Sequence, residues 1–422
     1  MQNSVSIEGF SDRLIGLINE RNLGQAIDLV YAFAHQTVVS ANHKGFALRL
    51  PELDAAIVQI ADLMRPMFPA AFPACTEHVC LATEVYPTGG HRQIINSVCE
   101  EIPSHIMFTD LFGRIVSRKV NLEGLITPSV LSSITLTSDS LVGKIMSAVN
   151  FIHSVSPKKI WVFGHHQDVV AVLAAVIFDR GQRSVFVHHC DHDPALGATI
   201  KFPVHFDFTD ECHRNCTSIG LDSKQLALYT PPARGRAAAP GTGFTVATSG
   251  SMNKFTQQNQ GIRYKDVVRA VLQHPRVETF HHVGEVDNQF ANELRAFLFE
   301  SGIPSDRMKF PGQVQRISDY LLSVGTSAYL SSFPIPGGAA TAEVQSAGIP
   351  VIYFNPKKNK MPLLAIDSIF TSKELEWTEL DGISRICDIL LQNWDYFSNA
   401  AHQKYSASFS REVFLQQLEN IR

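Results

Sequence analysis

Tyr329–Pro350 reads YLSSFPIPGGAATAEVQSAGIP, and this stretch carries the pattern that decides the predicted fold. A short apolar strand leads into a turn rich in proline and glycine, and a helix is expected from about Ala339 to Gly348. Glycine lets the backbone approach a ligand, and the free N–H groups of a first helical turn favour an anion such as a diphosphate. Glu343 lies one turn into this helix, where it is placed to accept hydrogen bonds from two ribose hydroxyls. The plainer alternative is a strand-to-helix turn whose glutamate interacts with the helix dipole.

Short apolar runs rich in β-branched residues recur on both sides of this stretch, separated by segments with helical spacing. Alternation of this kind predicts βαβ units and a parallel sheet. We therefore expect an α/β protein with two Rossmann-like, doubly wound domains that face a cleft lined by the carboxyl ends of both sets of strands. The expected strands are HVCLATEV, SHIMFTD, KIWVFGHH and SVFVHHC in the first series, and FTVATSG, VETFHHVG, RMKFPG, AYLSSFP and PVIYFN in the second.

The segment PPARGRAAAPGTG at 231–243 is the best domain boundary in the sequence, because it is rich in Pro, Gly and Ala and lacks apolar periodicity. Up to about Pro69, apolar residues recur at helical spacing and predict a small all-helical appendage. The expected parts are the helical appendage at 1–75, a first Rossmann-like domain at 76–235, and a second such domain, ending in helices, at 243–422.

Composition excludes several classes of protein. With 422 residues, 45% of them hydrophobic and 18% charged, the chain has an ordinary globular composition with room for two or three domains. A formal net charge of -4 gives no field for nucleic acid, and we expect no transmembrane segment. The N-terminal MQNSVSIEGF does not resemble a signal peptide, and the seven Cys are odd in number and scattered. Both observations predict a cytoplasmic protein with reduced thiols.

The stretch SSFPIPGGAATAEVQSAGIPVI resembles the donor-binding motif of GT-B glycosyltransferases, in which a glycine-rich turn opens a helix with a Thr cluster and an acidic residue. The pattern is most similar to that of O-GlcNAc transferases and related bacterial N-glycosyltransferases, and the resemblance spans roughly 79–351. Those families carry a run of Thr where this chain has Ala339, Ala340 and Thr341, so two hydroxyl groups are missing. The resemblance implies a UDP-sugar donor bound mainly by the C-terminal domain, with no obligatory metal and with inversion at the sugar.

The resemblance assigns donor-binding roles to residues of the second domain. Lys254, in TSGSMNKF, matches a lysine that contacts the diphosphate and neutralises the leaving group; an unpaired surface lysine is the alternative. Gln313 and Val314, in FPGQV, match the loop whose backbone holds the uracil ring. The remaining predicted donor ligands are Gly337, Gly338, Ala339 and Ala340 through their backbone amides, Thr341 through its hydroxyl, and Glu343 through the ribose.

In the first domain, VYPTGGHRQII contains a Thr-Gly-Gly-His turn found after the first strand of many GT-B enzymes. Gly89 and Gly90 would let this loop approach the donor phosphates, and His91 would face the acceptor hydroxyl. A neutral imidazole with a pKa near 6.5 is a suitable general base. The alternative is a turn that simply caps a helix.

The run SVFVHHCDHDPALG supplies a second group of candidates for acceptor chemistry, because His188, His189, Asp191 and His192 follow an apolar strand together. Asp191 is either the base or the carboxylate that orients His192. His166, in WVFGHHQD, is expected to line the same cleft. A zinc site drawn from this run and from Cys212, His213 and Cys216 in ECHRNC lacks a standard paired spacing, so no metal is predicted. Hydrogen-bonded histidines at a strand end are the remaining alternative.

These assignments predict transfer of a sugar from a nucleoside diphosphate sugar to a protein or glycan acceptor, without a resident cofactor. His91, or the pair Asp191 and His192, deprotonates the acceptor, while Lys254, Thr341 and the helix N-terminus stabilise the leaving diphosphate. Two alternatives stay open. One is a nucleotide-sugar epimerase of the same architecture, and the other is a catalytically inactive nucleotide-sugar-binding or scaffold protein whose N-terminal helices dock to a partner.

Overall fold

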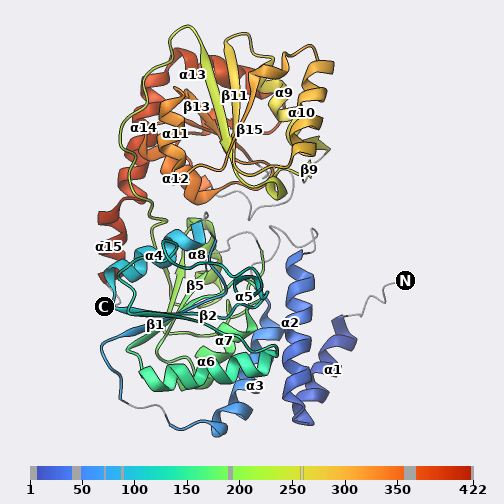
Figure 1. Cartoon of the computed structure of the whole chain (residues 1–422), viewed down its shortest axis with the longest axis vertical. Coiled ribbons are helices and arrows are strands. Elements are labelled where there is room, and N and C mark those ends of the chain that lie inside the picture. The colour runs from blue at the N-terminus through green and yellow to red at the C-terminus, as the bar shows by residue number, and fades with distance from the viewer. Residues whose placement is uncertain are drawn as a thin grey trace. The chain divides into compact units, whose positions relative to one another are not determined.

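The chain forms two compact units in the computed structural model, Met1–Gln225 and Leu226–Arg422 (Figure 1). Both are α/β units built on a parallel sheet, as the strand pattern predicts. The structure describes residues 7–39, 49–70, 73–86, 90–188, 193–256, 258–259, 261–355 and 367–419.

The second unit begins before the Pro- and Gly-rich segment at 231–243 because the residues after Gln225 pack on the C-terminal helices. The backbone N–H of Ala227 donates a hydrogen bond of 2.5 Å to Oε1 of Gln417, which lies in α15 (Arg411–Glu419). A lack of apolar periodicity shows that a segment contributes little to a core, but it does not show which unit the segment packs against.

The first unit contains a seven-stranded sheet with all neighbours parallel, in the order β3-β2-β1-β4-β5-β6-β7. The four strands expected from apolar runs are confirmed as β1, β2, β4 and β5. Strands β3, β6 and β7 were not expected from the sequence, because their sequences SSIT, VHFD and SKQ are short and rich in polar residues. Two of these are edge strands, where polar side chains are tolerated. The bounds are β1 His78–Ala82, β2 Ser104–Phe108, β3 Ser132–Thr135, β4 Lys159–Phe163, β5 Ser184–His188, β6 Val204–Asp207 and β7 Ser223–Gln225.

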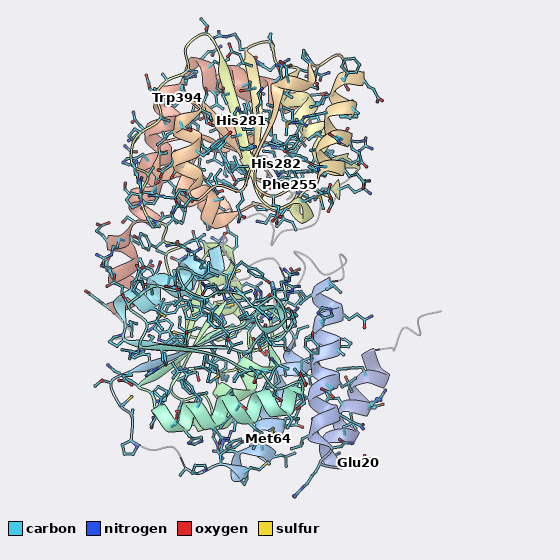
Figure 2. All side chains as sticks on the ribbon, in the orientation of Figure 1. Glu20, Met64, Phe255, His281, His282 and Trp394 are labelled. Carbon is cyan, nitrogen blue, oxygen red and sulfur yellow. The ribbon has the colours of Figure 1, made fainter. Side chains whose placement is uncertain are left out.

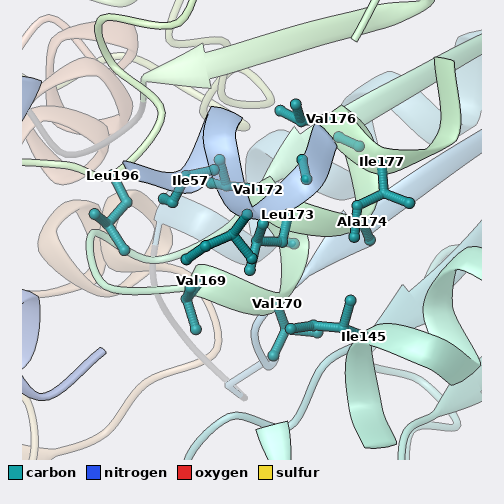
Figure 3. Packing of buried hydrophobic residues seen from close by; sticks show 14 of the residues in the cluster. Ile57, Ile145, Val169, Val170, Val172, Leu173, Ala174, Val176, Ile177 and Leu196 are labelled. Carbon is teal, nitrogen blue, oxygen red and sulfur yellow. The ribbon is translucent and has the colours of Figure 1, made fainter. Parts of the chain in front are cut away.

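Helix α7 (Val169–Asp179) lies at the centre of this unit and is buried on every face from Val169 to Phe178. An apolar helix is buried all round when other elements cover both of its sides. Here α3 (Pro51–Met64) and α6 (Leu141–Val155) pack against it, and Figure 3 shows Ile57 and Ile145 from those helices beside its side chains. Among the described helices, none combines the length and apolar character needed to cross a membrane.

The N-terminal helices α1 (Ile7–Asn19), α2 (Leu23–Val39) and α3 belong to the same hydrophobic cluster as the sheet and α7. Hydrogen bonds to a buried carboxylate also join these helices to the rest of the unit. The carboxylate of Asp54, on α3, accepts hydrogen bonds from the backbone N–H of Gly197 at 2.6 Å and from the N–H and hydroxyl of Thr199 at 2.8 and 2.6 Å. The predicted helical region therefore packs on the first unit through both apolar contacts and hydrogen bonds. The other helices of this unit are α4 Gly90–Glu101, α5 Arg114–Ser117 and α8 Asp210–Ser218.

The second unit contains a six-stranded parallel sheet in the order β12-β11-β8-β13-β14-β15. The five expected strands are confirmed, and among the described residues the two-residue strands β9, β10 and β15 were not expected from the sequence. The helix predicted at about 339–348 is confirmed as α12 (Gly338–Ser346). The strand bounds are β8 Phe244–Ser249, β11 Val277–Val283, β12 Met308–Gly312, β13 Ala328–Leu330, β14 Val351–Phe354 and β15 Glu376–Trp377, with a small antiparallel pair β9 Gln258–Asn259 and β10 Ile262–Arg263. The other helices are α9 Tyr264–Leu272, α10 Asn288–Glu300, α11 Ile317–Ser323, α13 Asp381–Gln392 and α14 Trp394–Ser408.

Both sheets reverse their strand order beside the first strand of the unit. The chain runs outward from β1 to β2 and β3, then crosses to β4 on the other side of β1; it likewise runs from β8 to β11 and β12, then crosses to β13. Doubly wound sheets bind ligands at the carboxyl ends of the strands that flank such a reversal. The loops after β1 and β4, and those after β8 and β13, are therefore where a site is expected.

Candidate functional site

In the second unit, the reversal point brings a lysine to the start of a helix. Lys254 lies in the short 3-10 helix Met252–Lys254, just after β8, and Gly337 is the N-cap of α12, just after β13. A Cβ atom built on Gly337 would lie 3.6 Å from Nζ of Lys254. Among the residues that the structure describes, no side chain caps α12. An ammonium group beside the N–H groups of a helical first turn forms a site for a phosphate or diphosphate.

Glycines end three neighbouring strands at this edge of the sheet. Gly250 donates its N–H to the carbonyl oxygen of Val283 at 2.9 Å, and Gly284 donates to that of Gly312 at 2.9 Å. Gly284 has a φ of +140°, and a Cβ atom there would lie 2.1 Å from the carbonyl oxygen of Gly250. A larger residue would push the loops apart, so the close approach of the β8 and β11 loops requires glycine at this position.

His282 holds the first of these glycine turns in place. Figure 2 shows its ring on β11 next to Phe255, with the ring centroids 4.5 Å apart. Because a carbonyl oxygen only accepts, Nε2–H donates to Gly250 at 3.2 Å, and Nδ1 accepts from the hydroxyl of Tyr264 at 2.7 Å. Burial lowers the pKa of His282 to about 4, so the ring is neutral near pH 7. His282 was not expected as a site residue, and its only signal in the sequence is its position near the end of a buried strand.

Glu343, the predicted ribose ligand, lies beside the loop predicted to hold uracil. Its Oε1 accepts hydrogen bonds from the N–H and the hydroxyl of Ser318, both at 2.9 Å, and Nε of Arg316 is 4.0 Å from the same oxygen. Gln313 and Val314 immediately precede this part of the chain, at the carboxyl end of β12. Within the described ranges, both hydrogen bonds to the carboxylate of Glu343 reach Oε1.

The first turn of α12 presents backbone rather than hydroxyl groups. Gly338, Ala339 and Ala340 are partly exposed there. Thr341 is fully buried, and its Oγ1 has no hydrogen-bond partner among the residues that the structure describes. Phosphate roles for the Thr341 hydroxyl and for the amides of the preceding residues stay predictions, and the first N–H groups of a helix are the kind of donor that such a role needs.

In the first unit, the reversal point gathers two histidines. His91 is the second residue of α4, after β1, and His165 follows β4; their ring centroids are 4.9 Å apart in a T-shaped arrangement. Nε2 of His91 lies 2.7 Å from the carbonyl oxygen of Phe163 and must carry the proton, so Nδ1 is its basic nitrogen. Burial lowers the pKa of His91 to about 4 and that of His165 to about 3. The expectation of an ordinary pKa near 6.5 for His91 is therefore wrong, because the ring is withdrawn from water.

Asp168 positions the loop that carries His165. Its buried carboxylate accepts hydrogen bonds from the hydroxyls of Thr83 and Thr109 at 2.6 and 2.7 Å and from the N–H of Ala171 at 3.0 Å, which caps α7. Thr83 in turn accepts from the backbone N–H of His165 at 2.7 Å. These bonds join the ends of β1, β2 and β4, so they fix the geometry of the edge on which both histidines lie.

A buried carboxylate completes this edge. Glu84 follows β1, its side chain is 1% exposed, and Nη1 of Arg114 lies 3.1 Å from its Oε1. The same Nη1 donates to the hydroxyl of Tyr86 at 2.7 Å. Burial raises the pKa of Glu84, while the positive charge of Arg114 opposes that rise. Oε2 of Glu84 is buried and makes no hydrogen bond within the described part of the chain. Glu84 and Arg114 were not expected as site residues, although Glu84 lies near the carboxyl end of one expected strand and Arg114 follows another.

The other predicted residues of the first unit lie next to this group in the chain, in a different group, or outside the described residues. Gly90 is the first residue of α4, whereas Gly89, His189, Asp191 and His192 lie outside the described residues. Nε2 of His166 is 3.9 Å from Oδ2 of Asp193. His188 is buried against another group, which includes Asp207 at 3.1 Å.

The sequence matches no known protein-family model and no curated protein. Its structure is similar to several solved ones. HepE from Anabaena, in complex with UDP and glucose, aligns with a TM-score of 0.58 at 14% identity over 82% of this chain and 99% of its own. A variant O-GlcNAc transferase from Thermobaculum terrenum aligns with a TM-score of 0.59 at 12% identity over 97% of this chain and 80% of its own.

A structure of UDP-GlcNAc 2-epimerase from Neisseria meningitidis bound to UDP-GlcNAc is also similar, with a TM-score of 0.51 at 11% identity over 82% of this chain and 100% of its own. At these identities the similarity concerns the fold. The chain has the fold of GT-B glycosyltransferases and resembles the O-GlcNAc transferase group, which confirms the fold expected from the motif at 329–350.

Proposed function

We propose that this chain is a glycosyltransferase that moves a sugar from a UDP-sugar to a protein or glycan acceptor. The observation that carries the proposal is the convergence of Lys254 and the N-terminus of α12 at the reversal point of the second sheet. This is where a doubly wound unit binds a nucleotide, and the charge is that required by a diphosphate. Solved structures of the same fold hold UDP, as in HepE, or UDP-GlcNAc, as in the epimerase.

The donor fits the second unit in three parts. Lys254 and the amides from Gly338 to Ala340 receive the diphosphate, Oε2 of Glu343 accepts from the ribose, and the backbone of Gln313 and Val314 borders the uracil. A lysine and a helix N-terminus supply positive charge where the leaving diphosphate develops negative charge. The proposed reaction therefore needs no metal at the phosphates, and a single displacement inverts the sugar carbon.

The acceptor chemistry is assigned to the first unit. Nδ1 of His91 is the basic nitrogen of a neutral ring, which suits removal of a proton from an acceptor as the bond to the sugar forms. Asp191 with His192 is the alternative base. A pKa of about 4 makes free His91 a weak base, so we propose that proton removal by His91 acts together with stabilisation of the leaving diphosphate by Lys254.

A calorimetric titration of the full chain tests the donor assignment. UDP and UDP-sugars should bind, and Lys254→Ala should weaken UDP binding by about 10- to 150-fold through loss of a charge-assisted hydrogen bond. Lys309→Ala removes an exposed lysine of β12 and serves as the matched control. Binding of another nucleotide in place of UDP, or equal losses in the two variants, would contradict the proposal.

A UDP-sugar epimerase is the second candidate, favoured by the buried carboxylates of Glu84 and Asp168 near His91 and His165. An epimerase needs acid and base groups shielded from water, but no acceptor. Conversion of a UDP-sugar to its epimer by the chain alone would establish it. UDP-sugar binding with neither conversion nor transfer over a broad acceptor panel would instead indicate a binding or scaffold protein. The reason to test for this outcome is that Ala339 and Ala340 lack the hydroxyl groups found at these positions in the similar enzymes.

A further inference from the structure

Four buried side chains of the first unit lie together near the carboxyl ends of β5 and β6, namely His188, His205, Asp207 and Cys216. One ligand atom from each lies within 4.8 Å of all the others. We propose that these four residues bind a zinc ion. The proposed site uses none of the residues assigned above to the donor, and it replaces the sequence-based expectation that the chain has no metal.

The fold places these residues by register and alternation. His188 and Asp207 end β5 and β6 and are direct partners in the parallel pairing of the two strands. His205 precedes Asp207 by two residues, so both side chains leave the same face of β6. Cys216 comes from α8, which packs on β6. Because the set is drawn from three elements, no paired zinc-binding spacing exists for the sequence to reveal.

Three of the four groups converge on a single oxygen atom, Oδ1 of Asp207. Nδ1 of His188 lies 3.1 Å from it, Nε2 of His205 3.5 Å and Sγ of Cys216 3.6 Å. Hydrogen bonds account for the contacts of His188 and Cys216 with this oxygen, but not for the contact of His205. His205 is 1% exposed, yet its Nε2 makes no hydrogen bond with any residue that the structure describes, which is costly for a buried nitrogen.

A shared central ion does account for it. Tetrahedral zinc with bonds of about 2.0 Å to N and O and about 2.3 Å to S separates N and O ligands by about 3.3 Å, S and O by about 3.5 Å, and S and N by about 3.6 Å. Besides the distances to Oδ1, Sγ of Cys216 is 3.7 Å from Nδ1 of His188. These four of the six pairwise separations agree with the tetrahedral values to within about 0.2 Å, and the other two, from His205 to His188 and to Cys216, are at most 4.8 Å.

The charges also match a divalent cation. On binding, the thiol of Cys216 loses its proton, and the resulting thiolate and the carboxylate of Asp207 together balance Zn²⁺, with both histidines neutral. Nitrogen and sulfur ligands favour zinc over magnesium or calcium, which prefer oxygen. Four protein ligands close the coordination sphere, so we assign the ion a structural role that joins β5, β6 and α8.

A second layer of hydrogen bonds orients the carboxylate. The hydroxyl of Ser223, on β7, donates to Oδ2 of Asp207 at 2.5 Å, and Nδ1 of His213 lies 2.9 Å from the same hydroxyl. With Oδ2 held from outside, Oδ1 is turned toward the other three ligands. Such outer partners are a regular feature of metal sites, where they fix the direction of the ligand.

The metal content of the purified full chain tests this proposal. Elemental analysis should find about one zinc per chain, as expected for a closed four-ligand site. Removal of zinc with a chelator should lower the unfolding temperature, and zinc chloride should restore it. Titration of the stripped chain with cobalt chloride should give visible ligand-field bands and a thiolate-to-cobalt charge-transfer band. This measurement on the unaltered chain does not depend on a variant that folds.

Two cysteines on α8 provide a matched pair of variants. Cys212 and Cys216 are both buried on the same helix, but only Cys216 belongs to the four residues. Cys216→Ser should lower zinc affinity by at least about tenfold and abolish the charge-transfer band, whereas Cys212→Ser should keep both. Absence of zinc from the purified chain together with no response to cobalt, or equal losses in the two variants, would overturn the proposal.

Discussion

The two units share a topology, and in each the strand order reverses beside the first strand. The groups at the carboxyl ends of the strands next to this reversal differ between the units. In the second unit, this edge of the sheet consists of backbone at Gly250, Gly284 and Gly337, with Lys254 as its cation. In the first unit, it consists of ionisable side chains held away from water, including His91 and Glu84. A backbone edge suits an anion that all donors share, whereas side chains suit proton transfer to a particular acceptor.

This difference explains why the two edges were not equally visible in the sequence. A glycine-rich turn followed by a helix is contiguous, so residues 329–350 show it directly. The histidine group of the first unit combines residues from α4 and from the loop after β4, which only the sheet brings together. The contrast also separates the expected effects of mutation: changes in the first unit should alter chemistry, and changes in the second should alter nucleotide binding.

The largest effect is expected for His91→Ala. If His91 is the base, kcat in a transfer assay should fall by about 10² to 10⁴, while the affinity for UDP stays unchanged because the nucleotide is held by the second unit. His105→Ala, a partly exposed histidine at the opposite end of β2, is the control. A kcat within a few-fold of the unaltered chain would transfer the role to Asp191 and His192.

Protonation of buried histidines on acidification should destabilise the first unit more than the second, although the pKa of Asp54, which burial raises to about 6, opposes part of this loss. Burial lowers the pKa values of His78, His91 and His165 in the first unit to about 4, 4 and 3, and that of His282 in the second to about 4. These folded pKa values lie below the unfolded value of about 6.5, so stability present above that pH is lost as pH falls toward 4. A shift from 6.5 to 4 corresponds to at most about 3 kcal/mol per histidine.

Denaturant unfolding at pH 7 and pH 5 measures this difference. Of the three tryptophans, Trp161 lies in the first unit, while Trp377 and Trp394 lie in the second. Fluorescence of the Trp161→Phe variant therefore reports the second unit, and the signal lost from the unaltered chain reports the first. Equal losses of stability in both units would show that the lowered pKa values do not distinguish them.

Gly284→Ala tests the backbone edge of the second unit. The new Cβ atom would lie 2.1 Å from the carbonyl oxygen of Gly250, in a backbone conformation that favours glycine. We expect a loss of about 2 to 4 kcal/mol in the free energy of unfolding, together with weaker UDP binding. Gly302→Ala has a positive φ of 77° with open space around it, and should cost only about 1 kcal/mol. Similar losses for the two variants would show that close packing at Gly284 is unimportant.

The smallest effect is expected for Glu343→Ala, which should weaken UDP binding by about 1.5 to 3 kcal/mol through loss of hydrogen bonds to the ribose. Pyrophosphate has no ribose, so its affinity should not change. This ligand pair divides the donor site into a nucleoside part and a phosphate part within one variant. Parallel losses for UDP and pyrophosphate would indicate that Glu343 acts through Ser318 and α11 rather than through the ribose.

Much of the architecture could be predicted because it depends on local patterns. Buried parallel strands such as β4, KIWVF, are continuous apolar runs, and α12 begins at a glycine turn. Strands without such runs were not expected. Strand β3 has the sequence SSIT and lies at an edge of the sheet. Strand β6 has the sequence VHFD and is buried, but its histidine and aspartate interrupt the apolar pattern that would indicate burial. The expected pKa of about 6.5 for His91 was also wrong. Burial lowers this pKa, and burial depends on the residues packed around the ring in the fold, not on those next to it in the chain.

The sequence by itself determined the two series of strands, the glycine-rich turn before α12 and the placement of Glu343 one turn into that helix, because each follows from spacing within a few residues. Only the tertiary structure decided which distant groups meet. It brought Lys254 to Gly337, His91 to His165, and Cys216 to His188 and Asp207. The residues of each pair come from different elements of a sheet whose strand order differs from the order along the chain. Their separation in the sequence therefore does not indicate the distance between them in the fold.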